Sequence, residues 1–236
     1  MIYLTGDTHG EVGINKLVNG NNPLTKTLTK DDKLIILGDF GLFWNVPRSD
    51  TEKYWLDWLS NQEYQVLFLD GNHENFDLLE QFEEVEMFGG KVGVAYDNIY
   101  HLKRGEVYTI EDNKILVVGG ASSIDRVYRT LNKSWWEAEE LSLAEIKNTE
   151  DNIVSESHKF DYVLTHTIPG SMKRFFGFYN GLFCSTSEYF SSIYRIISFK
   201  HWYTGHMHMD KTVDNVTILY DKIIKLGDTI PGDELE

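Results

Sequence analysis

Short apolar runs that each end in a polar residue recur along the first third of the chain. Ile2–Thr5, Lys33–Leu37 and Gln65–Leu69 are mostly apolar over four or five residues, which predicts buried strands. Apolar residues at helical spacing predict helices over Thr51–Ser60 and Asn75–Glu84. Because strand-like and helix-like segments alternate, the pattern favours an α/β fold with parallel strand pairing.

The later part of the chain changes character. The same patterns predict two strands within 98–110, a strand at each of 114–118, 162–164 and 201–204, a loop over 175–183, a helix over 187–198 and a closing hairpin over 216–226. The segment 134–157 is acidic and helical by composition, so we expect surface helices there. We expect one domain over residues 1–236, with an acidic helical surface insertion around 123–160.

The composition is that of a globular protein. The chain has 236 residues, of which 42% are hydrophobic and 25% charged, and this excludes a disordered chain or a coiled coil. No apolar stretch approaches the roughly 20 residues that span a bilayer, and no signal segment precedes Ile2, so we expect no membrane association. Cys184 is the only cysteine, which favours a reducing, cytoplasmic location.

The charge limits the possible partners. Thirty-seven acidic residues against 22 basic ones give a formal net charge of -15, so general nucleic-acid binding is not expected. A phosphate-bearing substrate is still compatible with this charge, because bound divalent cations would make the site itself positive.

Polar residues typical of metal ligands follow five predicted strands. The five segments are Gly6-Asp7-Thr8-His9, Gly38-Asp39, Gly71-Asn72-His73-Glu74, Thr165-His166 and Gly205-His206-Met207-His208. In open α/β sheets the carboxyl ends of the strands converge on one crevice, so these side chains should meet there. Residues i and i+2 of an extended backbone point the same way. We therefore expect Asp7 and His9 to face one ion, and His206 and His208 to face one ion.

The donor atoms suggest two metal ions. Oxygen and nitrogen ligands of this kind suit Mn²⁺, Fe, Zn²⁺ or Ni²⁺, of which we expect Mn²⁺. Seven ligands are too many for one ion with an open position, but they suit two ions about 4 Å apart that share a carboxylate. Asp39, alone at its strand end, is the best bridging candidate. The predicted ligands are Asp7, His9, Asp39, Asn72, His166, His206 and His208.

These motifs resemble those of the calcineurin-like metallophosphoesterase superfamily. Its motifs D-x-H, G-D, G-N-H-[DE], a single His and G-H-x-H occur here in the same order between residues 7 and 208. The segments 119–126 and 134–136 are similar to a small bacterial and phage-borne subgroup. The resemblance implies an α/β fold, a four-layer αββα sandwich of two mixed sheets flanked by helices. It also implies one metal on Asp7, His9, Asp39 and His208, and a second on Asp39, Asn72, His166 and His206.

The resemblance implies hydrolysis of a phosphodiester or phosphomonoester, with a small or nucleotide-type substrate, by a metal-bridging hydroxide. A Ser/Thr-type protein phosphatase is one alternative, but residues 38–44 lack the second acid and the arginine of that branch. A nuclease is another, and the acidic charge counts against it. A non-catalytic metal-binding scaffold is a third, although all seven ligand positions are filled.

Within this hypothesis the residues take distinct roles. Asn72 and Asp39 join His73 as the predicted catalytic residues. His73 neighbours the ligands without being one, so we expect it to protonate the leaving group as a general acid. Glu74 or a nearby carboxylate is expected to orient His73.

Substrate contacts are the least specific predictions. Arg126 and Arg129 are candidates for holding phosphate, because a guanidinium fork matches phosphate oxygens, although such arginines are more often paired in solvent than bound to substrate. Several aromatic residues can either stack on a flat leaving group or pack within a loop: Trp44, Phe175, Phe176, Phe178 and Tyr179.

Overall fold

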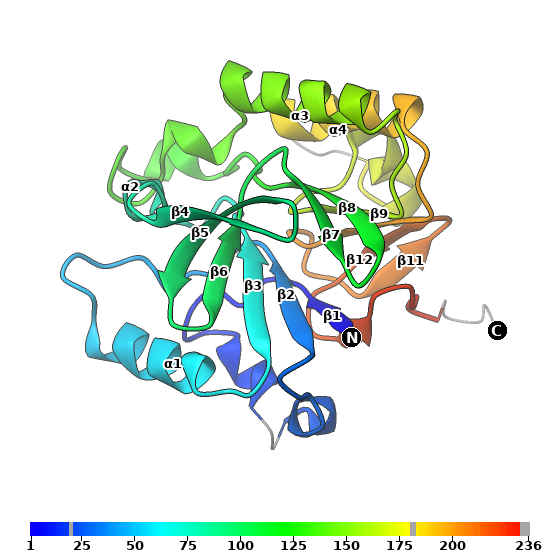
Figure 1. Ribbon diagram of the computed structural model, residues 1–236. Helices are drawn as coiled ribbons and strands as arrows, with labels where there is room; N and C mark the ends of the chain where they lie inside the picture. Colours follow the sequence, from blue (N-terminus) through cyan, green and yellow to red (C-terminus); the bar gives the residue numbers. More distant parts are fainter. Residues whose placement is uncertain (19–20, 180–182, 232–236) are drawn as a thin grey trace.

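Two mixed β-sheets form the centre of the protein (Figure 1). The computed structural model describes residues 1–18, 21–179 and 183–231. One sheet has the order β13 (Ile223–Lys225), β1 (Ile2–Thr5), β2 (Lys33–Leu37), β3 (Gln65–Leu69), β6 (Ile99–Leu102), β5 (Gly90–Tyr96), β4 (Glu83–Met87). The other has the order β11 (Lys211–Val213), β12 (Val216–Ile218), β10 (His201–Thr204), β9 (Tyr162–Thr165), β8 (Asn113–Val118), β7 (Val107–Ile110). The pairs β1–β2, β2–β3 and β3–β6 are parallel, as are β8–β9, β9–β10 and β10–β12.

Each sheet is covered on both faces, which explains why its parallel strands are continuous apolar runs. Successive side chains of a strand point to opposite faces. In β2, Ile35 and Leu37 therefore pack between the two sheets, while Leu34 and Ile36 pack against the outer layer.

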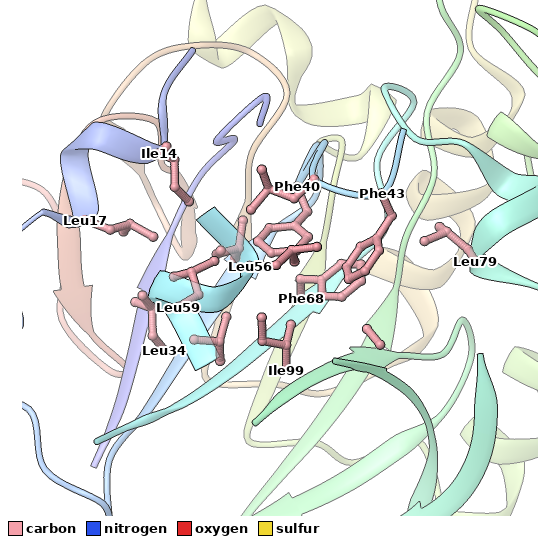
Figure 2. Close-up of a cluster of buried hydrophobic side chains, with 14 of the residues drawn as sticks. Ile14, Leu17, Leu34, Phe40, Phe43, Leu56, Leu59, Phe68, Leu79 and Ile99 are labelled. Atoms are coloured by element: carbon pink, nitrogen blue, oxygen red, sulfur yellow. The ribbon is translucent and has the colours of Figure 1, made fainter. Parts of the chain in front are cut away.

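Helices form the outer layers. The helices are α1 (Asp50–Ser60), α2 (Phe76–Leu79), α3 (Leu143–Ser155) and α4 (Ser185–Ile196), with 3₁₀ turns η1 (Ile14–Leu17), η2 (Pro23–Lys26), η3 (Arg126–Tyr128), η4 (Glu137–Glu139) and η5 (Gly170–Phe176). Figure 2 shows Leu56 and Leu59 of α1 beside Phe68 of the first sheet. On the opposite side of the molecule, Ile153 of α3 and Phe190 of α4 pack against the second sheet. The predicted four-layer αββα sandwich is confirmed.

Two of the sequence-based elements are wrong. The predicted helix over 75–84 is only one turn, since α2 ends at Leu79 and β4 begins at Glu83. Strand β4 pairs along its whole length with β5 in a hairpin that turns at Phe88 and Gly89, both with positive φ, and this pairing outweighs the helical spacing. The predicted hairpin over 216–226 does not form, because β12 pairs with β10 and β11 whereas β13 crosses to the other sheet and pairs with β1.

The segment between β8 and β9 is tied to the rest of the fold by a buried arginine. Arg104 donates from Nε to Asp70 at 2.7 Å and from Nη2 to the Ala138 carbonyl at 2.9 Å. Helix α3 in this segment also buries Thr149 and Ile153, so it has an apolar face besides its acidic one. Asp70 directly precedes Gly71-Asn72-His73, so the segment is anchored beside the predicted metal ligands. Within the described residues, no helix has the length and apolar character needed to cross a membrane.

Candidate metal centre

The loops after β1 and β2 interlock at one edge of the first sheet. The backbone N–H of His9 donates to the Asp39 carbonyl at 2.7 Å, and Thr8 donates to the same oxygen at 3.2 Å. His9 and Asp39 both have left-handed backbones, with φ of 46° and 48°. Such φ values cost energy for residues other than glycine, and they cluster at functional sites. Here they turn both side chains toward a common space.

One group of donor atoms is formed by Asp7, His9 and His208, which lie within 4.8 Å of one another. The Nε2 atoms of His9 and His208 are 3.0 Å apart, and His208 Nε2 lies 3.0 Å from Asp7 Oδ2. That carboxylate oxygen is buried and accepts no hydrogen bond, whereas Asp7 Oδ1 accepts one from the backbone N–H of His206 at 2.9 Å. Two imidazole nitrogens and one uncommitted carboxylate oxygen are a donor set that suits a divalent cation.

A second group is formed by Asp39, His166 and His206. The Nδ1 atom of His166 lies 2.8 Å from the Leu37 carbonyl, which can only accept, so Nδ1 carries the proton. Burial opposes a charge on His166, but the charge and hydrogen bond of Asp39 raise the pKa of His166 to about 10, so Nε2 also carries a proton and faces Asn72 Oδ1 at 3.2 Å. Because the Leu37 carbonyl holds Nδ1, Nε2 is the nitrogen that would bind a cation, which would displace its proton.

Asp39 lies between the two groups. Its Oδ1 is 3.3 Å from His166 Nε2, and its Oδ2 is 3.7 Å from His9 Nε2. The backbone N–H of His73 donates to Oδ1 at 2.7 Å and fixes the carboxylate in place. His9, Asp39 and His73 also form a third group of close donor atoms. The two oxygens of one side chain thus face different histidines.

Two glycines permit this crowding. A Cβ on Gly71 would lie 2.1 Å from Asp39 Oδ1, and a Cβ on Gly38 would lie 2.2 Å from His166 Nδ1. Gly38 also has a φ of 92°, which side chains disfavour. The glycines of the G-D and G-N-H motifs therefore let the backbone lie directly against the side chains of His166 and Asp39.

The electrostatics keep the two aspartates ionised. Burial raises the pKa of Asp7, but the contact with His208 and the charge of His166 outweigh it, so that pKa lies below its ordinary value. Burial likewise opposes ionisation of Asp39, and the charge and hydrogen bond of His166 lower the pKa of Asp39 far more. Burial lowers the pKa of His206 to about 4, so this imidazole is neutral and able to bind a cation at physiological pH.

The i, i+2 expectation for the last motif does not hold. His206 lies with Asp39 and His166, whereas His208 lies with Asp7 and His9. Both residues have positive φ, 65° and 47°, so the backbone is not extended there and the side chains diverge. Spacing along the sequence cannot reveal such a turn.

Two residues near Asn72 were missed by the sequence analysis. The side-chain amide of Asn72 donates to Ser123 Oγ at 3.1 Å. Ser123 is held in turn by Glu139, whose carboxylate accepts from the Ser123 backbone N–H at 3.1 Å. Ser123 lies in the glycine-rich 119–126 segment, which was the available signal, but nothing in the sequence indicates that it reaches Asn72.

His73 lies at the edge of the candidate ligands, close to His9 and Asp39, and Arg129 lies beside it. Guanidinium nitrogens of Arg129 lie 3.3 Å from both ring nitrogens of His73, and Nε of Arg129 pairs with Asp125 at 2.9 Å. The expected orienting role of Glu74 is wrong. Its buried carboxylate accepts from the backbone N–H groups of Phe40 and Gly41, at 2.7 and 3.3 Å, which stabilises the loop after β2 instead.

The remaining substrate candidates separate clearly. Two cavities open beside the candidate ligands. Arg126 is exposed, pairs with Glu140 at 3.4 Å and is not among the described lining residues of either cavity. Trp44 lines one cavity, and Phe178 and Tyr179 line another. Phe176 is buried in the core of the second sheet, and Phe175 is exposed outside the described lining of both cavities.

A four-layer αββα sandwich with clustered aspartates and histidines at its strand ends defines a metallohydrolase-type architecture. The chain belongs to the calcineurin-like phosphoesterase family, whose model matches residues 1–210. The family predicted from the motifs is thereby confirmed. This membership supports metal-dependent hydrolysis of phosphoesters as the general activity and divalent metal ions as cofactors. No curated protein matches the chain significantly.

Proposed function

We propose that the protein hydrolyses small phosphoesters at a dinuclear centre bridged by Asp39. The observation that carries this proposal is the position of the Asp39 carboxylate, with Oδ1 facing His166 and Oδ2 facing His9. In this assignment one ion takes Asp7, His9, Asp39 and His208, and the other takes Asp39, Asn72, His166 and His206. We propose Mn²⁺ as the bound ion, with Fe, Zn²⁺ and Ni²⁺ as the alternatives that the mixed oxygen and nitrogen donors also suit.

When bound at these residues, divalent cations would supply Lewis acidity for the phosphate and would lower the pKa of a coordinated water. The side chains of the protein supply the charge and the orientation of the ligand atoms. Asp7 and Asp39 keep their negative charge despite burial, and the hydrogen bond from Nδ1 of His166 to the Leu37 carbonyl holds its Nε2 facing Asp39 and Asn72. These groups are preorganised, so little side-chain ordering is needed on binding.

His73 is the proposed general acid for the leaving group. Burial lowers its pKa, and the charge of Arg129 lowers it further, while the charge of Asp39 acts in the opposite direction. An anionic phosphoester beside the ring favours the charged imidazolium, which can then give a proton to the departing oxygen. Arg129, in contact with His73, is placed to hold a phosphate oxygen at the same point.

The test is turnover of p-nitrophenyl phosphate and bis-p-nitrophenyl phosphate by protein loaded with Mn²⁺, together with its metal content by mass spectrometry. We expect turnover of at least one ester, which a chelator abolishes and Mn²⁺ restores. Protein that holds two ions per chain and hydrolyses neither ester would contradict the proposal and favour a binding scaffold.

A further inference from the structure

Two cavities meet at the candidate centre. The larger has a volume of about 810 Å³ and is lined by Asp39, Asn72 and His206. The smaller has a volume of about 450 Å³ and is lined by His9 on the other side. Among the described lining residues, His73 is the one that the two cavities share. A phosphate held at the centre would therefore have a cavity on each side.

The larger cavity has a cationic and aromatic lining. Arg129 and Lys173 supply positive charge, Asp125 in the same lining pairs with Arg129 at 2.9 Å, and Phe178, Tyr179 and Phe183 supply flat apolar surface. Tyr179 and Phe183 are mostly exposed, so their faces are available to a ligand. A flat aromatic group stacks on such side chains, and the cations tolerate further negative charge on it.

The smaller cavity differs in charge. Its described lining includes the apolar side chains of Val12, Leu42 and Trp44 but no lysine or arginine. Two acids, Glu11 and Glu52, also line it. The Glu52 carboxylate is used locally, because it accepts backbone N–H groups of residues 44, 45 and 49 at 2.7, 2.9 and 2.7 Å. This cavity therefore suits an uncharged group and disfavours a second phosphate.

We propose that the substrate is a phosphodiester, with a flat aromatic arm in the larger cavity and a smaller uncharged arm in the cavity of Val12 and Trp44. This rests on the proposed function of the centre. A monoester has a single arm and would use one cavity, whereas both cavities reach the size of ligand sites. In the reaction, water adds its oxygen to phosphorus, one ester P–O bond breaks, the released arm leaves with a proton, and the other arm remains as a monoester.

Filling the smaller cavity tests the assignment. Val12 is 78% exposed and Thr51 is exposed on another wall, so Val12→Trp and Thr51→Trp should fold and occupy the space. We expect each to lower kcat/KM for bis-p-nitrophenyl phosphate about tenfold or more, and kcat/KM for p-nitrophenyl phosphate less than about twofold. Val154→Trp is the matched control, because Val154 is 65% exposed on α3 and outside both described cavity linings, and it should change neither value.

A binding measurement provides a readout independent of turnover. Diphenyl phosphate is a slowly hydrolysed diester, and phenylphosphonate is its one-armed counterpart. In NMR spectra of zinc-loaded protein, we expect diphenyl phosphate to shift the indole N–H of Trp44, identified with Trp44→Phe, and phenylphosphonate to leave it unshifted. The shift should disappear in Val12→Trp.

The outcomes separate the two proposals. Turnover of the monoester with none of the diester would overturn the phosphodiester assignment and leave the proposed function intact. Unchanged diester turnover in both tryptophan variants, or equal loss on both esters, would also overturn it. Absence of turnover of either ester by fully metal-loaded wild-type protein would instead remove the proposed function.

Discussion

The side-chain amide of Asn72 donates to Ser123 Oγ at 3.1 Å, and this leaves the carbonyl oxygen of Asn72 facing His166 Nε2 at 3.2 Å. With its N–H end held by the hydroxyl, Asn72 points its oxygen end into the candidate centre. Ser123 comes from the segment between β8 and β9, so a segment that supplies none of the proposed ligands contacts one of them.

Ser123→Ala should weaken binding of the ion assigned to Asn72, because the amide loses the partner that fixes its orientation. We expect roughly tenfold weaker binding of one ion per chain, the scale seen when such supporting hydrogen bonds are lost. Equilibrium dialysis with metal analysis measures it. Ser122→Ala is the matched control, since Ser122 Oγ is buried and makes no hydrogen bond. Equal affinity for both ions in Ser123→Ala and wild type would contradict the orienting role.

Asp39→Asn should release both ions, since the shared carboxylate supplies a charge and an oxygen to each group. We expect the metal content to fall well below two ions per chain and the activity to fall with it. Asp77→Asn, on an exposed residue of α2, is the control for loss of one negative charge. Full occupancy of both sites in Asp39→Asn would exclude the bridging assignment.

His73→Ala should keep both metals and lose rate according to the leaving group. An alkyl phosphoester needs a proton on its departing oxygen, so we expect a loss of about a hundredfold or more. A p-nitrophenyl ester, whose leaving group is already stable as an anion, should lose only a few-fold. Steady-state kinetics on the two esters, with His158→Ala as a surface control, make the comparison. The same loss on both esters would argue against a general acid.

Arg129→Ala should raise KM more than it lowers kcat, because the guanidinium is proposed to bind phosphate in the ground state as well. A rise of about tenfold corresponds to the loss of one charge-assisted hydrogen bond. Arg126→Ala is the natural control, since Arg126 is a nearby exposed arginine that pairs with Glu140. A KM that does not change in Arg129→Ala would discard this contact.

The sequence predicts well the strands that are determined by a local run of apolar residues. The bounds of β1, β2 and β3 are the predicted ones, because each is a continuous apolar run that ends at a polar motif. The family and the sandwich followed from the order of the motifs. Strand β4 was predicted as part of a helix, because the helical spacing hides its hairpin with β5. The predicted hairpin over 216–226 has the wrong pairing, because the partner of β13 is β1, at the other end of the chain.

The candidate centre was predictable in its residue types and less so in its detailed contacts. The motifs themselves identify Asp7, Asp39 and His166, and the structure brings them together. The divergence of His206 and His208 depends on positive φ values that spacing does not encode. The structural use of Glu74 and the hydrogen bond from Asn72 to Ser123 both join segments distant in sequence, so they become visible only in three dimensions.

The proposed ligands come from both sheets: Asp7, His9, Asp39 and Asn72 follow strands of the first, and His166, His206 and His208 follow strands of the second. Neither half of the sandwich carries a complete set. Cations bound here would link the two sheets, which otherwise contact each other through apolar side chains. The free energy of cation binding would then add to the free energy of folding. Removal of the cations would thus lower the activity and the free energy of unfolding together.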